Sequence, residues 1–189
     1  MEYKIVIADD EPITRMDIRE ILTHAGYNVV GEASDGFDAV ELCRKEQPDM
    51  VLLDIKMPLL DGLKAARIIH EEGLADAILL ITAYSGKEFV DQAKETGVAG
   101  YVVKPIREES LIPMVEIGIS KGREMAKMRQ EVTKTKQRLE DRALIEKAKG
   151  LLMKQQNISE EEAFKMIRKI GMDKRRPMRD IAKIILMNQ

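Results

Sequence analysis

Residues 4–10 read KIVIADD, and residues 50–54 read MVLLD. Each segment is a short apolar run that ends in aspartate, at Asp9 and Asp10 in the first and at Asp54 in the second. Apolar runs without alternation are typical of strands that helices cover on both faces. Because parallel strands end at the same edge of a sheet, the three acids are expected to converge on one site.

The first half of the chain alternates strand-like with helix-like segments, which predicts a doubly wound α/β fold around a parallel sheet. The five strands expected are 4–8, 28–33, 50–53, 77–81 and 100–103. Pro12 fits the first turn of a helix, and Asp35 and Ser85 are suited to cap two further helices. With the flavodoxin-like strand order 2-1-3-4-5, strands one and three are neighbours and the acids meet at their carboxyl ends.

Three carboxylates in one crevice repel one another unless a cation joins them, and their oxygen atoms suit Mg²⁺. Two residues at the ends of later strands complete the set. Thr82 offers a hydroxyl for a phosphoryl oxygen, and Lys104 offers a mobile positive charge. Pro105 follows Lys104, and a cis bond between them is accessible because proline reduces the trans preference to about 0.5–1 kcal/mol.

The combination of Asp9-Asp10, Asp54, Thr82 and Lys104-Pro105 resembles the receiver domain of two-component response regulators, over roughly residues 1–120. The resemblance implies that Asp54 accepts a phosphoryl group from a sensor histidine kinase, so that the domain is a switch rather than an enzyme. Taken singly, any one of these acids has an ordinary alternative as a helix cap or a solvated charge.

The same resemblance assigns roles to the remaining site residues. Mg²⁺ is expected to be held by Asp9, Asp10, Asp54 and the backbone carbonyl of Lys56. Lys104 and Thr82 would hold the phosphoryl group, and Tyr101 matches the aromatic switch of the family.

The charge of the chain is divided unequally between its two halves. Residues 1–117 carry 12 Lys and Arg against 23 Asp and Glu, whereas residues 118–189 carry 19 against 10. Clustered positive charge in the second half suits a polyanion such as a nucleic acid. The sequence contains no apolar run long enough to span a bilayer and no signal-peptide pattern at its start, so a cytoplasmic protein without a membrane partner is expected.

A polar, proline-free stretch at 119–141 predicts a helical coiled-coil linker. Its apolar and small residues recur at alternating spacings of three and four, a heptad seam. These residues are Met125, Met128, Val132, Thr135 and Leu139. The seam is short, with Thr135 and then Arg142 at core positions, and a solvated connecting helix is the alternative. The helix is expected to continue from the last helix of the receiver, with Pro113 in its first turn.

Residues 142–189 show three amphipathic patterns, which predict a small all-α domain after a receiver domain at 1–118. Ser159 and Glu162 form a capping box at the second helix, Gly171 is expected to end it, and Pro177 opens the third. The polar faces carry the basic residues expected to contact nucleic acid, namely Lys147, Lys149, Lys154, Arg168, Lys169, Lys174, Arg175, Arg176, Arg179 and Lys183.

The segment IEKAKGLLM at 145–153, with Ser159, EAF at 162–164 and IA at 181–182, resembles the ANTAR domain over roughly residues 136–189. That family binds paired small hairpins in nascent RNA and prevents a transcription terminator from forming. One departure is Gly171, where the family usually has alanine. A receiver followed by ANTAR is similar to the arrangement in regulators of ethanolamine utilisation.

The sequence therefore predicts a phosphorylation-activated antiterminator that binds structured RNA as a homodimer. Two alternatives remain open, a DNA-binding transcription factor that places one helix in a major groove and a protein-interaction module. The Ala148-Lys149-Gly150 match, together with the absence of a recognisable recognition helix, favours RNA. Gly150 adds a hint, because a mid-helix glycine costs about 1 kcal/mol relative to alanine. Close approach by another helix or by RNA would account for it.

Overall fold

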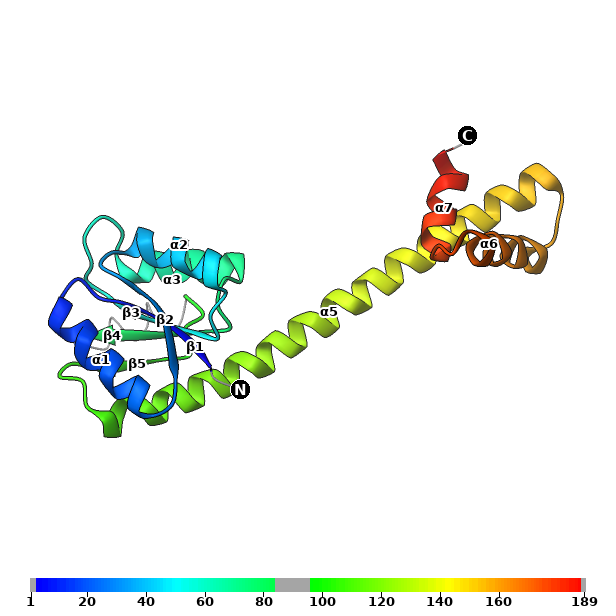
Figure 1. Cartoon of the computed structure of the whole chain (residues 1–189). Coiled ribbons are helices and arrows are strands. Elements are labelled where there is room, and N and C mark those ends of the chain that lie inside the picture. The colour runs from blue at the N-terminus through cyan, green and yellow to red at the C-terminus, as the bar shows by residue number, and fades with distance from the viewer. Residues whose placement is uncertain (1–2, 84–95, 188–189) are drawn as a thin grey trace. The chain divides into compact units, whose positions relative to one another are not determined.

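The computed structural model describes residues 3–83 and 96–187 (Figure 1). The chain divides into two compact units, Met1–Lys127 and Met128–Gln189. One long helix, α5 (Glu108–Gln156), contributes residues to both units. In the described part of the chain, no helix has the length and apolar character needed to cross a membrane.

A five-stranded parallel sheet forms the centre of the first unit, and its strand order β2-β1-β3-β4-β5 confirms the prediction. The strands are β1 (Lys4–Ala8), β2 (Asn28–Ala33), β3 (Met50–Asp54), β4 (Ala77–Thr82) and β5 (Gly100–Val103). β3 and β4 each extend one residue further than predicted, so Asp54 and Thr82 are their last residues. Both strands are buried along their whole length, as expected for runs without alternation.

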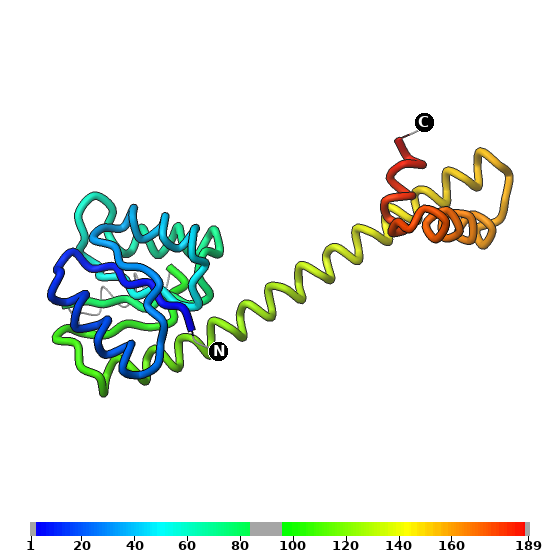
Figure 2. The backbone as a smooth tube through the Cα atoms, viewed as in Figure 1, coloured from blue at the N-terminus to red at the C-terminus, as the bar shows by residue number. Residues whose placement is uncertain are grey.

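Helices cover both faces of this sheet (Figures 1 and 2). The described helices of the unit are α1 (Pro12–His24), α2 (Gly36–Glu46), α3 (Gly62–Glu72) and the first part of α5. Successive residues of β1 point to opposite faces: Val6 packs in the core that includes α2 and α3, and Ile7 packs in the core that includes α1 and α5. Pro12 begins α1, and Asp35 caps α2 by accepting bonds from two backbone N–H groups, as predicted. The fourth helix predicted after Ser85 lies outside the described residues.

Two glycines bring α5 close to the sheet. A Cβ on Gly122 would lie 2.7 Å from the carbonyl oxygen of Asp76, and one on Gly118 would meet the side chain of Met50. These positions therefore favour glycine because the helix approaches so closely. The helix begins at Glu108, which puts Pro113 in its second turn rather than in the predicted first turn. Glu108 and Glu109 occupy the first turn, where negative charge is favourable.

The second unit is a small helical core, which confirms the predicted three-helix arrangement. It is formed by the C-terminal part of α5 with α6 (Glu160–Lys174) and α7 (Met178–Met187). The fully buried members of this core include Ala148, Ala163, Ile167 and Ala182. The capping box at the start of α6 is present, with the Glu162 carboxylate accepting from the Ser159 N–H at 2.8 Å.

α6 does not end at Gly171, and that prediction was wrong. The helix continues to Lys174 and ends with Arg175 in the left-handed region, at a φ of 52°. Gly171 is buried, and a Cβ there would lie 3.0 Å from the carbonyl oxygen of Arg176. The backbone N–H of Arg176 donates to the Gly171 carbonyl at 2.9 Å. The glycine is therefore explained by the close turn between α6 and α7.

Candidate functional site

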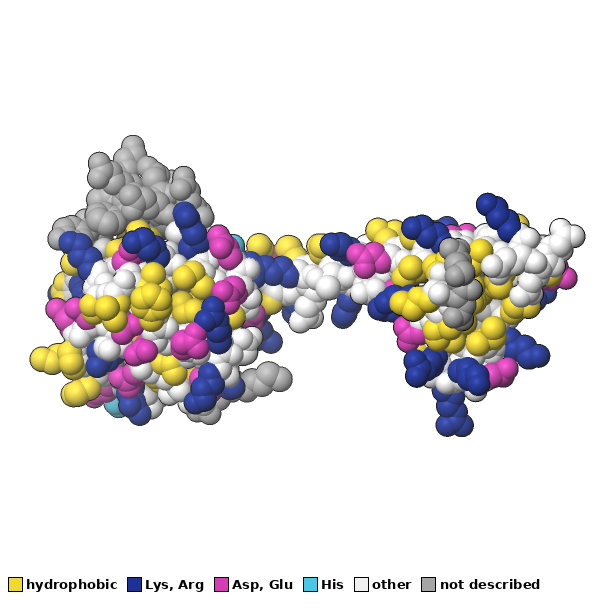
Figure 3. Space-filling view, turned by 90° about the horizontal axis from the view of Figure 1, so that it is seen from above, with side chains coloured by type: hydrophobic (Ala, Val, Ile, Leu, Met, Phe, Trp, Pro, Cys, Tyr) yellow, Lys and Arg dark blue, Asp and Glu magenta, His cyan; other side chains and the backbone are white. Residues whose placement is uncertain are grey.

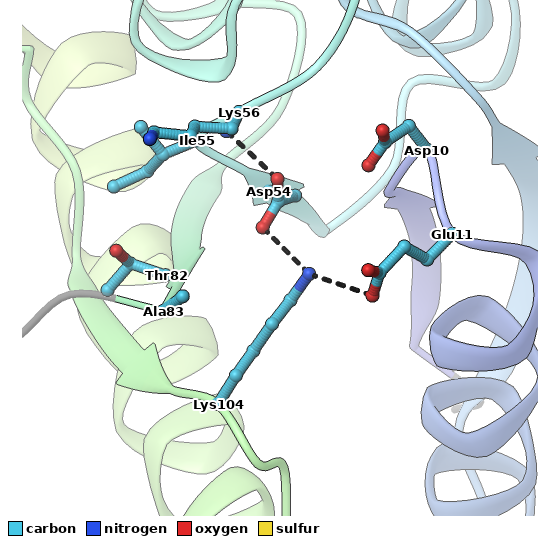
Figure 4. Close-up of a pocket in the computed structure, with 8 residues that line it drawn as sticks. All are labelled: Asp10, Glu11, Asp54, Ile55, Lys56, Thr82, Ala83 and Lys104. Atoms are coloured by element: carbon cyan, nitrogen blue, oxygen red, sulfur yellow. Dashed lines mark hydrogen bonds and ion pairs between the residues drawn. The ribbon is translucent and has the colours of Figure 1, made fainter.

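A cavity of about 270 Å³ opens where the strands of the sheet end (Figure 4). The residues that line it are Asp10, Glu11, Asp54, Ile55, Lys56, Thr82, Ala83 and Lys104. The structure thus brings Asp10, Asp54, Thr82 and Lys104 to one place. Asp9 is fully buried and reaches the same site through its contact with Lys104.

Lys104 is the centre of the charge arrangement. Its Nζ lies 2.8 Å from Asp9 Oδ2, 3.0 Å from Asp54 Oδ1 and 3.6 Å from Glu11 Oε2. The ammonium therefore joins two buried carboxylates that would otherwise repel each other. The peptide bond between Lys104 and Pro105 is cis.

The surroundings of the site shift the pKa values of both Asp54 and Lys104. Burial raises the pKa of Asp54 above its ordinary value, and the Lys104 ammonium only partly offsets that effect. The backbone N–H of Lys56 also favours the Asp54 carboxylate, donating to Oδ2 at 2.9 Å. Burial by itself lowers the pKa of Lys104, but the adjacent carboxylates of Asp9 and Asp54 outweigh it and hold that pKa above its usual range. Lys104 therefore stays charged at neutral pH.

The loop after β3 holds Asp54 in place. Gly62, the first residue of α3, packs so closely that a Cβ there would overlap the carbonyl oxygen of Asp54. Its N–H donates to the carbonyl of Ile55 at 2.9 Å. Glycine at this position lets the loop fold back against the end of the strand.

The donor set fits Mg²⁺ in its chemistry, because Asp9, Asp10 and Asp54 offer the hard oxygen ligands that this ion prefers. Asp9 Oδ2 is buried and accepts no hydrogen bond that satisfies ordinary geometry, although the Lys104 ammonium lies 2.8 Å away. Over residues 3–83 and 96–187, however, no three acidic, histidine or cysteine side chains stand close enough together to hold a metal. The Lys104 ammonium supplies the positive charge in this arrangement.

Glu11 belongs to the site although the sequence analysis did not single it out. Its N–H donates to Asp9 Oδ1 at 2.9 Å, and its carboxylate faces Lys104. A hydrogen bond from the Thr14 hydroxyl, together with the charge of Lys104, lowers the pKa of Glu11. The available signal was its place as the third acid in the row Asp9-Asp10-Glu11.

The two predicted switch residues lie on adjacent strands. Thr82 is buried at the end of β4, whereas Tyr101 on β5 is 39% exposed. In the strand register Tyr101 is opposite Leu80, and Thr82 is opposite Val103. A coupled movement of Thr82 and Tyr101 remains a prediction.

Eight of the ten basic residues predicted in the second unit are exposed, and Figure 3 shows Lys and Arg side chains projecting from its surface. Lys149 is an exception, because its side chain is only 8% exposed and its Nζ lies 2.6 Å from Glu160 and 2.9 Å from Glu146. Lys149 ties α5 to the start of α6, so its expected place on an exposed basic face was wrong. Arg179 is half-buried and lies 3.3 Å from Asp141, joining α7 to α5.

Gly150 has open space beside it. A Cβ at this position would meet no heavy atom within 4 Å. No helix in the described part of the chain therefore approaches Gly150 closely. Contact of Gly150 with RNA remains a prediction.

Comparison with known proteins assigns both units. Residues 5–116 match the response regulator receiver domain, and residues 133–186 match the ANTAR domain. The transcriptional regulatory protein PdtaR of Mycobacterium tuberculosis (strain CDC 1551 / Oshkosh) is 42% identical over 183 residues, which cover 97% of this chain and 89% of that protein.

Solved structures resemble the first unit. The signal receiver domain of the putative response regulator NarL from Mycobacterium tuberculosis has a TM-score of 0.60 at 32% identity, covering 63% of this chain and 97% of that one. A chain of the CheX-CheY-BeF3-Mg+2 complex from Borrelia burgdorferi has a TM-score of 0.57 at 28% identity, covering 60% of this chain and 86% of that one. Because the receiver match spans more than half of the sequence and PdtaR is similar over nearly all of it, the chain belongs to the response regulator family, with an N-terminal receiver domain and a C-terminal ANTAR domain.

Proposed function

We propose that this protein is a phosphorylation-controlled RNA-binding antiterminator. A sensor histidine kinase phosphorylates Asp54, the phosphorylated receiver favours a homodimer, and the two ANTAR domains bind paired hairpins in an mRNA leader. The observation that carries the proposal is the contact of Lys104 with Asp54, 3.0 Å apart, in the same chain as an ANTAR domain. The protein acts in the cytoplasm, where nascent RNA is made, and it works as a switch rather than as an enzyme.

The chemistry assigned to Asp54 is nucleophilic attack on phosphorus. A carboxylate oxygen of Asp54 forms a bond to the phosphorus of a phosphohistidine, the bond from phosphorus to the imidazole nitrogen breaks, and the imidazole leaves with the electron pair. The product is an acyl phosphate on Asp54. Only the ionised carboxylate attacks, and Lys104 favours that form by partly offsetting the effect of burial on the pKa of Asp54.

The neighbouring side chains stabilise the group that is transferred. Lys104 neutralises charge on the phosphoryl oxygens, and the Thr82 hydroxyl donates a hydrogen bond to one of them. Asp9, Asp10, Asp54 and the backbone carbonyl of Lys56 would hold Mg²⁺ after drawing closer together than they stand in this structure. When bound, that ion neutralises further negative charge between the phosphoryl group and the acids.

The output rests on the exposed basic residues of the second unit. Lys149 and Arg179 are engaged within the unit, so RNA contact is assigned to the eight that are exposed. These are Lys147, Lys154, Arg168, Lys169, Lys174, Arg175, Arg176 and Lys183. Joining two such units in a dimer raises affinity for two hairpins on one RNA through effective concentration.

A side-by-side binding experiment tests this function. The full-length protein, activated with beryllofluoride and Mg²⁺, is titrated against a two-hairpin RNA and against duplex DNA of equal length at the same salt concentration. Tighter binding to the RNA is expected, with little change when the DNA sequence is varied. Sequence-specific binding to duplex DNA would instead support a DNA-binding transcription factor.

A further inference from the structure

An apolar stripe runs along the surface of α5. We define it by Met128, Val132, Thr135 and Leu139, whose three large apolar side chains are 51%, 68% and 63% exposed in that order. These four residues, with Glu131 and Lys136, line a groove of about 600 Å³. Figure 3 shows hydrophobic side chains at the surface of this part of α5, flanked by charged ones. A contiguous exposed apolar surface on a helix in water indicates a binding surface.

The spacing of the apolar stripe identifies what kind of element covers it. Val132 and Leu139 are seven residues apart, and Met128 and Thr135 occupy the second core position of each heptad. Met125 extends the same pattern by one position. A period of 3.5 residues is the pattern that packs against another helix with the same period.

The charges beside the apolar stripe are complementary to a second copy of the same helix. The first core positions of the heptads are 125, 132 and 139, and the second core positions are 128 and 135. In a parallel, in-register pair, the residue just before a first core position lies beside the residue just after the next second core position of the other helix. This geometry sets Glu131 against Lys136 of the second copy and Glu124 against Arg129 of the second copy. Symmetry repeats each contact. Among the described residues, none of these four side chains forms an ion pair within the chain, so all four remain available.

An antiparallel pair is less complementary. Residues that follow the second core position then face one another, and both of these residues, Arg129 and Lys136, are basic. The same register sets Glu131 beside Arg138 of the second copy, so that attraction and the repulsion between Arg129 and Lys136 offset each other, whereas all the flanking pairs named for the parallel register attract. Flanking charges of this kind determine helix orientation in coiled coils. We infer that α5 pairs with the α5 of a second copy in parallel and in register through the apolar stripe. This inference rests on the proposed homodimer and specifies its geometry.

The pair is short, and its length suits regulation. Lys121 and Arg142 occupy the core positions that would extend the seam at either end, and Thr135 is polar within it. The seam from Met125 to Leu139 spans about 20 Å of helix. So short a coil binds weakly by itself and forms when the receiver adds its own contacts. A parallel pair also brings both copies of Leu139 to the same end of the coil, as binding two hairpins on one RNA requires.

Charge reversal tests the orientation. Dimer dissociation constants are measured by sedimentation equilibrium in beryllofluoride for the wild type, Glu131→Lys, Lys136→Glu and the double variant. Each single reversal should weaken the dimer by about fivefold or more, because two exposed ion pairs become repulsions. The double variant should restore wild-type affinity. Reversal of Lys134, which lies outside the seam, to glutamate serves as a control and should change affinity little.

Disulfide trapping gives an independent measurement. Met128→Cys and Leu139→Cys are oxidised separately in the activated full-length protein, and both should form covalent dimers. Cys43 does not interfere, because it is buried and burial raises the pKa of its thiol to about 12. In an antiparallel pair, at most one of the two introduced cysteines lies beside the same cysteine of the second copy. At most one variant would then cross-link.

The outcomes separate the orientation from the dimer. A wild type that remains monomeric in beryllofluoride would overturn both the proposed dimer and this geometry. A wild-type dimer that shows no rescue in the double variant, or that cross-links through at most one of the two cysteines, would overturn the parallel geometry alone.

Discussion

The ammonium of Lys104 lies 3.0 Å from Asp54 Oδ1, although the two residues come from strands that are not neighbours. Asp54 ends β3, Lys104 follows β5, and β4 lies between them. The contact therefore spans the edge of the sheet where β4 ends in Thr82. A change of charge at Asp54 acts directly on the end of β5, the strand that carries Tyr101 and leads into α5.

Replacement of Lys104 by methionine should slow phosphorylation of Asp54. Methionine keeps most of the unbranched side chain but removes the charge that partly offsets burial at Asp54. We expect a decrease of about 10²-fold, the usual effect of removing one donor that stabilises charge in a transition state. The measurement is the initial rate of mass increase with a small phosphodonor and Mg²⁺. Lys64→Met is the matched control, because Lys64 is exposed and pairs with Asp61. Equal phosphorylation rates for Lys104→Met and Lys64→Met would show that Lys104 does not contribute to phosphorylation of Asp54.

In the metal-free protein, the Asp54 carboxylate should take up a proton at a higher pH than an ordinary aspartate does. Burial raises the pKa of Asp54. As the pH falls, this carboxylate therefore takes up its proton at a pH higher than about 3.9, which is the pKa of an exposed aspartate. The folded state then binds more protons than the unfolded chain at this residue, and the contribution of Asp54 to stability decreases as pH rises through that interval. Carbon NMR of the Asp54 carboxyl group in the metal-free full-length protein, titrated from pH 7 downward, gives the pKa. A pKa at or below the value for an exposed aspartate contradicts the shift.

Much of the fold could be predicted because local signals agreed. Uniformly apolar runs identified the buried strands, and Asp35 and Ser159 identified two helix starts. The start of α5 was less predictable, since Pro113 is accepted in the second turn and the first turn is defined by Glu108 and Glu109. The predicted end of α6 at Gly171 was wrong for a similar reason. Its glycine is required by tertiary contact with the next turn, and a local pattern cannot distinguish that from a helix end.

The site was more predictable than the basic surface. Strand ends fix where Asp54 and Thr82 lie, so their convergence follows from topology alone. The role of Lys149 depends on which side chains reach it from α6, and Glu160 comes from a different helix. The sequence shows that Lys149 is a basic residue in a helical pattern. Its burial depends on how the helices pack.

Gly150→Ala should stabilise the second unit by about 0.8–1 kcal/mol, because alanine favours a helix and its Cβ meets nothing. Gly171→Ala is the matched control. It should give little or no gain, since its Cβ would crowd the Arg176 carbonyl. Hydrogen exchange of amides in α6 and α7 of the full-length protein measures both. We also expect weaker hairpin binding by Gly150→Ala, because the exposed Lys147 and Lys154 flank this position. Equal stabilisation by the two substitutions would contradict the packing described for Gly171.

The turn between α6 and α7 should contact phosphates. Replacing Arg175 by asparagine, which tolerates the left-handed backbone at this position, and Arg176 by alanine removes two charges. Binding to hairpin RNA should weaken, and the slope of log affinity against log salt should fall by up to about one for each phosphate-binding side chain removed. Lys165→Ala is the control, since Lys165 is exposed and pairs with Glu161. Both proteins are titrated with the hairpin RNA at several salt concentrations. If the double variant binds as tightly as the wild type at every salt concentration, the RNA surface lies elsewhere.

The central claim is that phosphorylation of Asp54 controls RNA binding, and one comparison tests it most directly. The affinity of the full-length protein for a two-hairpin RNA is measured with and without beryllofluoride, for the wild type and for Asp54→Asn, which is close in shape but has no carboxylate. Activation should tighten RNA binding by the wild type at least about tenfold, the lower part of the usual range for coupling between two sites, and it should leave the affinity of Asp54→Asn unchanged. Equal affinities of the wild type with and without beryllofluoride, or an equal response of Asp54→Asn, would contradict control through Asp54.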